Sequence, residues 1–237
     1  MKKKIIEIKN LSKSFGKKKI LYNLSLSVYK KESLVVIGES GSGKSVLMKC
    51  LNGLQDFERG EILFNEDYNV KALSGYSLEQ HTSKFGVLFQ NAALFDSLKI
   101  IENIFFNSKN FNKQIINDVG LEENILNKYP ADISIAVQKR VGLARAIISN
   151  PEILIFDEPT TGLDPMMANQ INKLIRQLVD KRKLTTITIT HDMKSVYEFA
   201  DKVAFIHKGK VDWYGQSKYL KKSNNQTMQN FINGKFN

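Results

Sequence analysis

The stretch GESGSGKS at residues 38–45 constrains the fold more strongly than any other part of the sequence. It follows the apolar run SLVVI, which has the length of a buried strand, and it leads into VLMKCLNGL, which we interpret as a helix. The motif matches the pattern G-x-x-x-x-G-K-S/T in full. A strand, a glycine-rich turn and a helix in this order predict an α/β fold built around a phosphate-binding loop.

Each part of this loop has a physical task. Glycines let the backbone wrap around phosphates without Cβ clashes, and the helix that begins near Lys44 points its positive dipole end at the anion. Lys44 adds a charge for the β- and γ-phosphates, and the Ser45 hydroxyl is a ligand for Mg²⁺. The loop alone leaves kinases, GTPases and helicases open. The predicted phosphate-binding residues are Gly38, Glu39, Ser40, Gly41, Ser42, Gly43, Lys44, Ser45 and Val46.

A pair of carboxylates follows a second apolar run. Asp157 ends EILIFD (152–157), where it can reach Mg²⁺ through water, and Glu158 comes next, where it can face an attacking water. Hydrolysis needs an oriented water and neutralised charge, so this pair favours hydrolysis over transfer to a bound acceptor. His191 follows the apolar run 185–190, and we expect it to contact a γ-phosphate.

The remaining pattern predicts one nucleotide-binding domain over residues 1–237. Apolar runs at 33–38, 152–157, 185–190 and 202–207 suit a mostly parallel core sheet, whereas alternating residues near the N-terminus and at 60–66 suit half-exposed antiparallel strands. Residues from about 92 to 150 have helical character, which predicts an inserted helical subdomain. The polar tail, about 215–237, is expected to be a short helix and a loose end.

Composition excludes few functions. The net charge of +11 is compatible with nucleic acid, with anionic lipid beside a membrane, or with solvated lysines, and the lysines form no single stripe. No apolar run is long enough to span a bilayer, and the lysine-rich start lacks the apolar core of a signal peptide, so export is not expected. The single cysteine, Cys50, is predicted to be a core residue in a reducing compartment.

Taken together, these motifs resemble the ABC (ATP-binding cassette) ATPase family over nearly the whole chain. By this resemblance, GESGSGKS is the Walker A loop and ILIFDE the Walker B strand. Phe15 in KSFG is similar to the aromatic residue that stacks on adenine, and Gln90 in VLFQNAALF to the Q-loop glutamine that senses Mg²⁺ and contacts the membrane subunit. Asp164 in TGLD is similar to the D-loop residue at the dimer seam, and His191 to the H-loop histidine.

The resemblance implies a head-to-tail homodimer with two ATP molecules between the subunits. Each site would take its Walker loops from one chain and its signature loop, with Ser134, from the other. The family pattern is L-S-G-G-Q, but residues 133–137 read ISIAV, so Ile135 and Ala136 replace both glycines. We expect an isoleucine to hinder the approach of a phosphate or to restrict φ and ψ, which would slow hydrolysis more than ATP binding. The implied Mg²⁺ ligands are Ser45, Gln90 and Asp157, and the implied catalytic residues are Glu158, His191 and Gln90.

Several stretches are similar to one subfamily, the ATPases of Mla-type phospholipid transport. They are GKSVLMKCLNGL, LFQNAALFDSLKIIENI and the tail MQNFINGK, where Phe231 and Gly234 are expected either to anchor the tail across the dimer or to belong to a frayed terminus. The implied partners are membrane permease subunits, a periplasmic lipid-binding protein and a small regulatory subunit, at the cytoplasmic face of the inner membrane. The groove for the permease is expected near Gln90, at Phe89, residues 92–95 and the apolar side of 100–106, whereas at least half of these residues are expected to pack in the core instead.

Two other classes remain open. A soluble ABC ATPase acting on nucleic acid or the ribosome usually carries two cassettes or a long coiled-coil insert, and this chain has neither, so no nucleic-acid partner is expected. A nucleotide-binding regulatory subunit that clamps but scarcely hydrolyses is supported only by the substituted signature loop.

Overall fold

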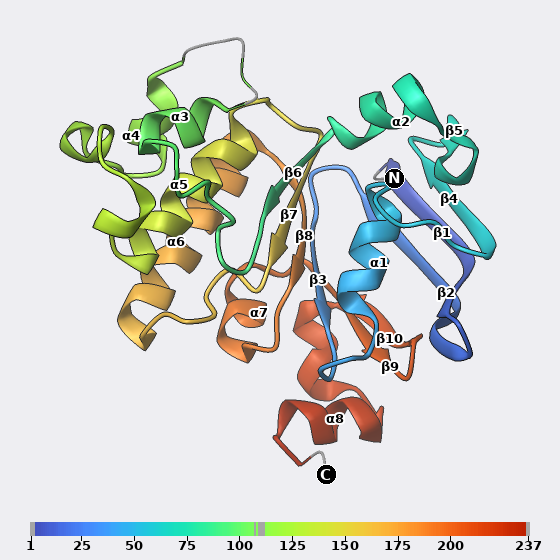
Figure 1. Cartoon of the computed structure of the whole chain (residues 1–237). Helices are drawn as coiled ribbons and strands as arrows, with labels where there is room; N and C mark the ends of the chain where they lie inside the picture. The colour runs from blue at the N-terminus through green and yellow to red at the C-terminus, as the bar shows by residue number, and fades with distance from the viewer. Residues whose placement is uncertain (1–2, 107, 109–111, 236–237) are drawn as a thin grey trace. The chain divides into compact units, whose positions relative to one another are not determined.

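The computed structural model describes residues 3–106, 108 and 112–235, and its elements are labelled in Figure 1. The described residues form two compact units. One contains the residues up to Thr82 together with those from Thr185 onward, and the other is Ser83–Leu184. The first unit therefore contains the phosphate-binding loop, and the second contains the acidic pair Asp157 and Glu158.

The first unit begins with an antiparallel sheet in the order β2-β1-β4-β5. Its strands are β1 (Lys4–Phe15), β2 (Lys18–Tyr29), β4 (Arg59–Phe64) and β5 (Tyr68–Asn69). The sequence predicted antiparallel strands here from alternation, and β1 pairs antiparallel with both β2 and β4. The apolar residues of the alternation are buried, as Ile6, Leu24 and Phe64 illustrate with no exposed surface.

The same unit carries a mostly parallel set of strands in the order β10-β9-β3-β8. They are β3 (Ser33–Ile37), β8 (Thr185–Ile189), β9 (Lys202–His207) and β10 (Lys210–Gln216). Strand β3 pairs parallel with β8 and β9, and all five of its residues are buried, as the continuous apolar run predicted. Strand β10 pairs antiparallel with β9 and was not predicted.

Short helices complete this unit. Helix α1 (Lys44–Leu51) follows the phosphate-binding loop, as predicted, and η1 (Val70–Ala72), α2 (Gly75–Thr82) and α7 (Met193–Phe199) follow later. The tail forms η4 (Ser217–Lys222) and α8 (Gln226–Ile232), and the end of the tail, residues 236–237, lies outside the described residues. The Phe231 ring lies 5.3 Å from the Phe205 ring of the same chain, between ring centroids, and its expected contact across a dimer stays a prediction. Gly234 is exposed.

The second unit combines two parallel strands with helices. Strands β6 (Phe85–Leu88) and β7 (Ile153–Asp157) pair with each other, and β6 was not predicted. The helices α3 (Ile100–Phe105), α4 (Gln114–Asp118), α5 (Ile135–Ile147) and α6 (Pro165–Arg182), with the short turns η2 (Glu123–Ile125) and η3 (Pro130–Asp132), surround one apolar core. All helices and turns described between residues 92 and 150 belong to this unit, which also includes both strands and α6. The assignment of one domain with a helical subdomain at 92–150 stays a prediction.

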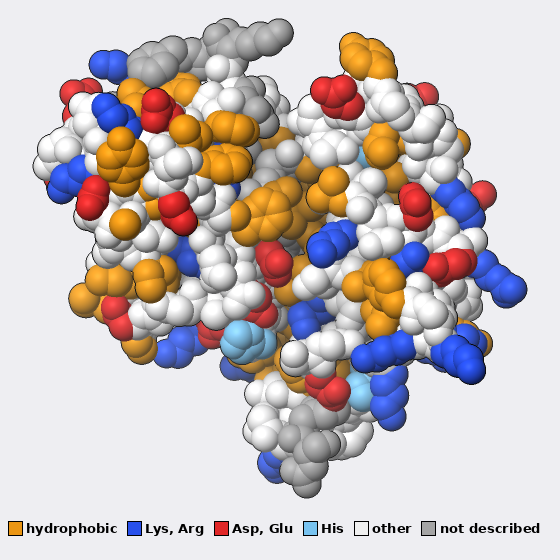
Figure 2. All heavy atoms as spheres, viewed as in Figure 1, with side chains coloured by type: hydrophobic (Ala, Val, Ile, Leu, Met, Phe, Trp, Pro, Cys, Tyr) orange, Lys and Arg blue, Asp and Glu red, His pale blue; other side chains and the backbone are white. Residues whose placement is uncertain are grey.

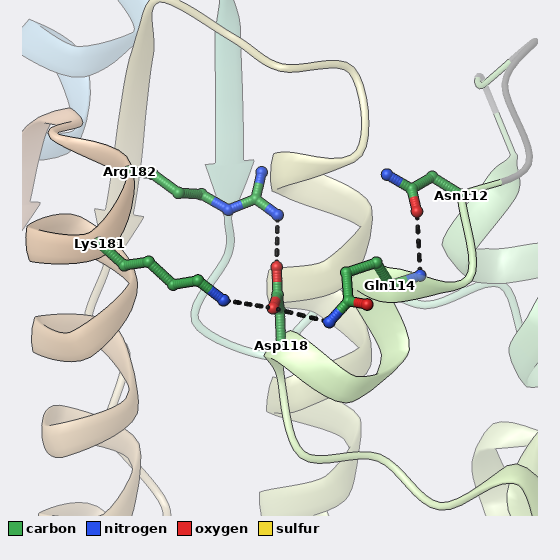
Figure 3. A network of polar contacts seen from close by, with 5 residues as sticks. All are labelled: Asn112, Gln114, Asp118, Lys181 and Arg182. Atoms are coloured by element: carbon green, nitrogen blue, oxygen red, sulfur yellow. Dashed lines mark hydrogen bonds and ion pairs between the residues drawn. The ribbon is translucent and has the colours of Figure 1, made fainter.

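A buried carboxylate joins α4 to the end of α6. The Asp118 side chain is only 5% exposed, and it accepts hydrogen bonds from Arg182 Nη2 at 2.6 Å and Lys181 Nζ at 3.0 Å (Figure 3). Gln114, one turn earlier on α4, faces the same carboxylate. The two cations outweigh burial and hold the pKa of Asp118 below its usual range.

The structure can be compared with three features of the composition: the cysteine, the distribution of charge and the length of apolar segments. Cys50 has no exposed surface, and burial raises its pKa to about 12, so the predicted core role is confirmed. Lys and Arg side chains are interspersed with acidic and apolar ones on the face shown in Figure 2. Within the described residues, no helix combines the length and apolar character needed to cross a membrane.

Candidate nucleotide-binding and hydrolysis site

The phosphate-binding loop is confined by the strands around it in the first unit. Gly38 has φ 152° and Gly43 has φ 104°, which favour glycine over any residue with a Cβ. A Cβ at Gly38 would lie 2.2 Å from the carbonyl oxygen of Ile206 on β9, and a Cβ at Gly43 would lie 2.7 Å from a methyl of Leu21 on β2. Both glycines are therefore required by conformation and by space.

The loop presents a donor set that fits a triphosphate. Helix α1 begins at Lys44, and the first-turn amides of a helix take their acceptors from outside the helix. The Lys44 ammonium donates to the carbonyl oxygens of Gly38 and Glu39, at 2.7 Å each, and thereby lies across the loop. The Ser42 hydroxyl is buried and has no hydrogen-bond partner among the described residues, and a phosphate oxygen would satisfy it. Ser45 is exposed, as a Mg²⁺ ligand would need to be.

Two aromatic side chains of the same unit are candidates to stack on the adenine. Phe15, the predicted residue, lies at the end of β1 and is 48% exposed, with Lys13 Nζ 5.0 Å from its ring centroid. Tyr22, on β2, is 45% exposed, and Lys210 Nζ lies 4.6 Å from its ring centroid. Because both rings are available, the role of Phe15 stays a prediction.

The acidic pair lies where a buried strand of the second unit ends. Phe156 is 1% exposed, whereas Asp157 and Glu158 are partly exposed. Glu158 has φ 48°, a left-handed conformation that costs a non-glycine residue on the order of 1–3 kcal/mol. The Thr161 hydroxyl donates to Glu158 Oε2 at 3.2 Å, and the Thr161 amide donates to the Glu158 carbonyl at 3.2 Å. The turn between Glu158 and Thr161 thus fixes the direction of the Glu158 carboxylate. The sequence alone did not identify Thr161 as part of the site.

The Q-loop follows β6 in the same unit, and helix α5 supports it. Gln90 is exposed, and the next residues include Ala92 and Ala93, with φ 56° and 46°. Arg145 Nη2 donates to Ala92 O at 2.6 Å, and its Nη1 donates to Ala93 O at 2.8 Å. These bonds hold a strained turn directly behind the predicted Q-loop glutamine.

A buried lysine links Gln90 to Glu158. Lys139 is 1% exposed, and its Nζ donates to the carbonyl oxygen of Gln90 and, at 3.5 Å, to that of Glu158. Burial lowers the pKa of Lys139, and the nearby Asp157 and Glu158 carboxylates oppose that shift. Sequence reasoning missed Lys139 because a lysine in a helix of mixed composition is usually solvated.

The signature loop begins helix α5. Ser134 is the N-cap, and its hydroxyl accepts a hydrogen bond from the Val137 amide at 3.4 Å. Ile135 and Ala136 form the first helical turn, so the backbone here adopts a conformation open to any residue. The expectation that Ile135 restricts φ and ψ is therefore not supported. The expectation that its side chain, 54% exposed, hinders a phosphate stays a prediction.

The two remaining predicted residues lie at helix starts. Asp164 is the N-cap of α6, and its Oδ1 accepts from the amides of Met166 and Met167 at 2.9 Å each, so its carboxylate already has a structural task. His191 is exposed between β8 and α7. Its neighbour Asp192 caps α7 through the amides of Lys194 and Ser195.

The residues available for Mg²⁺ suit a site shared with phosphate. The described part of the chain contains no group of three or more His, Cys, Asp or Glu side chains that could hold a metal ion. Mg²⁺ commonly uses one or two protein ligands together with waters and substrate phosphates. The Ser45 hydroxyl of the first unit and the Asp157 carboxylate of the second are each a group that Mg²⁺ can bind, and their roles as ligands stay predictions. When bound, Mg-ATP supplies the γ-phosphate that water attacks.

These observations define a nucleotide-binding protein with a P-loop fold. The ABC transporter family matches residues 21–161, which is more than half of the sequence. The chain belongs to the ABC transporter family, as an ATP-binding subunit that hydrolyses ATP with Mg²⁺. Proteins of this family form dimers and work with membrane permease subunits.

Individual relatives cover most of the chain. It is 35% identical to the methionine import ATP-binding protein MetN of Clostridium tetani, over 91% of this chain and 70% of the relative. It is 33% identical to the chloroplastic protein TRIGALACTOSYLDIACYLGLYCEROL 3 of Arabidopsis thaliana, over 97% of this chain and 74% of the relative. The structure is similar to the dimeric ATP-binding cassette MJ0796 bound to ADP and Pi, with a TM-score of 0.79 and 25% identity, over 90% of this chain and 99% of that one.

Proposed function

We propose that this chain is the ATPase of a phospholipid transporter. The observation that carries the proposal is sequence similarity to a relative named after a glycolipid, which extends over 97% of the chain. The motifs similar to Mla-type ATPases support the same substrate class. The transporter would place this subunit at the cytoplasmic face of the inner membrane, with a periplasmic lipid-binding protein and a small regulatory subunit as further partners.

In the proposed cycle, two copies bind two ATP molecules head to tail. Each site would take its phosphate-binding loop, residues 38–45, from one copy and its signature serine, Ser134, from the other. The γ-phosphate joins the copies, and its hydrolysis removes that link, so the dimer alternates between closed and open states. Glu158 would orient the water, His191 would contact the γ-phosphate, and Gln90 would be a ligand of Mg²⁺. Similarity to a dimeric cassette bound to ADP and Pi supports this arrangement.

The candidate permease groove divides into core and surface residues. Ala92, Ile100 and Ile104 are buried, so they serve the core of the second unit. Phe89, Phe95 and Phe106 are exposed by 43%, 43% and 49%. Figure 2, which shares the view of Figure 1, shows apolar side chains at the surface where α3 lies. The Phe95 and Phe106 rings are 4.4 Å apart between centroids, so they offer a paired aromatic surface that suits an apolar helix of a permease.

A second substrate class, amino acids, is favoured by the 35% identity to a methionine import protein. Two parallel transport assays separate these substrate classes. The chain is purified with the membrane subunits that accompany it and reconstituted into vesicles that contain a fluorescent phospholipid. We expect Mg-ATP to drive movement of the phospholipid, and Lys44→Ala to abolish that movement.

The second assay measures ATP-driven uptake of radiolabelled L-methionine by the same vesicles. Uptake of methionine driven by ATP, with no movement of lipid, would replace the lipid proposal with amino-acid import. Glu158→Gln is the control for hydrolysis in both assays, because it removes the carboxylate that orients water while retaining the turn made by Thr161.

A further inference from the structure

One side of helix α5 contacts the Q-loop, residues 90–93. Lys139, Gly142 and Arg145 recur at three-residue spacing, which places them along one side of the helix. Lys139 donates to Gln90 O, and Arg145 donates to the carbonyl oxygens of Ala92 and Ala93. A Cβ at Gly142 would lie 3.2 Å from the Ala92 side chain, so the helix and the loop are in close contact there.

Lys139 differs from Arg145 because it also reaches the catalytic turn. Its ammonium lies between Gln90 O and Glu158 O, two carbonyl oxygens 68 positions apart in sequence. A buried ammonium is costly unless its donors are satisfied, so both carbonyl oxygens are held toward the same nitrogen. The Glu158 carbonyl also accepts from the Thr161 amide, so a shift at this oxygen would change the turn that aims the Glu158 carboxylate.

We propose that Lys139 is a positioning residue that ties Gln90 and Glu158 together, so that movement of the Q-loop is transmitted to the carboxylate that orients water. This inference rests on the roles proposed above for Gln90 and Glu158. Lys139 touches neither nucleotide nor water in this scheme. It acts through the backbone of both residues, and it lies on the helix that begins with the signature Ser134.

The same helix provides a matched control. Arg140 is the next residue, and its Nη1 donates to the carbonyl oxygen of Val119 at 2.9 Å, so it also joins α5 to a backbone carbonyl. That carbonyl belongs neither to the Q-loop nor to the catalytic turn. Lys139→Met and Arg140→Met each remove one such cation from α5, and only the first removes the link between Gln90 and Glu158.

The first test separates turnover from nucleotide affinity. Phosphate release by the full-length chain is measured against ATP concentration for the wild type, Lys139→Met, Lys139→Arg and Arg140→Met, normalised to sites that bind Mg-ATP. We expect Lys139→Met to lower kcat on the order of 10–100-fold, as a small misplacement of a catalytic group does, with KM within about twofold. Lys139→Arg keeps a charged donor and should retain more of kcat, and Arg140→Met should stay within about twofold of the wild type.

The second test does not need catalysis. Hydrogen exchange is measured for peptides covering 89–93 and 157–161 in the same variants. We expect Lys139→Met to speed exchange in both segments together, and Arg140→Met to change neither. If Lys139→Met does not fold, Lys139→Gln and Lys139→Arg replace it in both tests.

The proposal is overturned if kcat of Lys139→Met equals that of Arg140→Met, or if only one of the two segments exchanges faster. A purely structural lysine would lower thermal stability and leave kcat per folded site unchanged. Failure of the lipid proposal is a separate result, because neither test involves lipid. Wild-type protein that turns over ATP but moves no lipid would leave this inference intact.

Discussion

Replacing Gly38 by alanine tests whether strand β9 confines the phosphate-binding loop. The new Cβ would lie 2.2 Å from Ile206 O and 2.9 Å from Ser42 Oγ, and real Cβ atoms essentially never approach so closely. The Ile206 oxygen belongs to the backbone of a buried strand, so it cannot move without moving the strand. Gly41→Ala is the control, because Gly41 also has a positive φ, 76°, but nothing lies within 4 Å of its Cβ position.

The expected magnitudes follow from this contrast. The left-handed conformation costs an alanine roughly 1–2 kcal/mol, and this cost applies to both variants. Forced overpacking adds typically about 1–3 kcal/mol, and it applies to Gly38→Ala alone. The free energy of unfolding should therefore fall by about 1–2 kcal/mol for Gly41→Ala and by about 2–5 kcal/mol for Gly38→Ala.

Urea denaturation of the purified chain, followed by tryptophan fluorescence or circular dichroism, measures these differences. Titration with Mg-ATP then reports on the loop itself, and Gly38→Ala should also weaken nucleotide binding more than Gly41→Ala does. Equal losses of stability in the two variants would refute the argument. They would show that strand β9 moves at Ile206 to accept the new Cβ with no further loss in the free energy of unfolding.

Three further substitutions test other parts of the site and fold. Asp118→Asn should lower the free energy of unfolding by about 1–3 kcal/mol at pH 7 in urea denaturation, because it leaves two cations without their carboxylate. The folded-state pKa of Asp118 is lowered, so the difference should be fully present above about pH 4 and shrink as the pH falls below that value. Restoring both glycines, Ile135→Gly with Ala136→Gly, should speed phosphate release, and an unchanged rate would show that the substituted loop is competent. Phe15→Ala should weaken Mg-ATP binding by about 1–3 kcal/mol in calorimetry, and if affinity is insensitive, the same change at Tyr22 identifies the alternative ring.

The sequence predicts strands well where burial leaves a strong pattern. The runs 33–38, 152–157, 185–190 and 202–207 all contain strands, because strands covered on both faces must be apolar throughout. Strand β6 has only four residues and includes Gly86, so it lacks that signal. A Cβ at Gly86 would lie 2.0 Å from Ala146 O, a close approach that only the folded structure reveals.

The site is predicted unevenly for a physical reason. Phosphate binding depends on consecutive residues, so the loop 38–45 is visible in the sequence as a pattern. The orientation of Glu158 depends on Thr161 nearby and on Lys139 from a separate helix, and a hydrogen bond between distant segments leaves no local pattern. The helical conformation of Ile135 agrees with the helical character predicted for residues 92–150, whereas the expectation of restricted φ and ψ came from the glycines of the family pattern.

The packing of the C-terminal segment has a practical meaning for anyone who edits this gene. Leu220 and Met228 are completely enclosed, and Phe231 lies on Phe205, which directly precedes the Ile206 that limits the glycine turn. Truncation after residue 216 would expose this apolar patch to solvent. It would also remove packing from strand β9, which confines the phosphate-binding loop at Ile206. Affinity tags and fluorescent fusions are therefore better joined beyond residue 235, through a flexible spacer, than in place of the final helix.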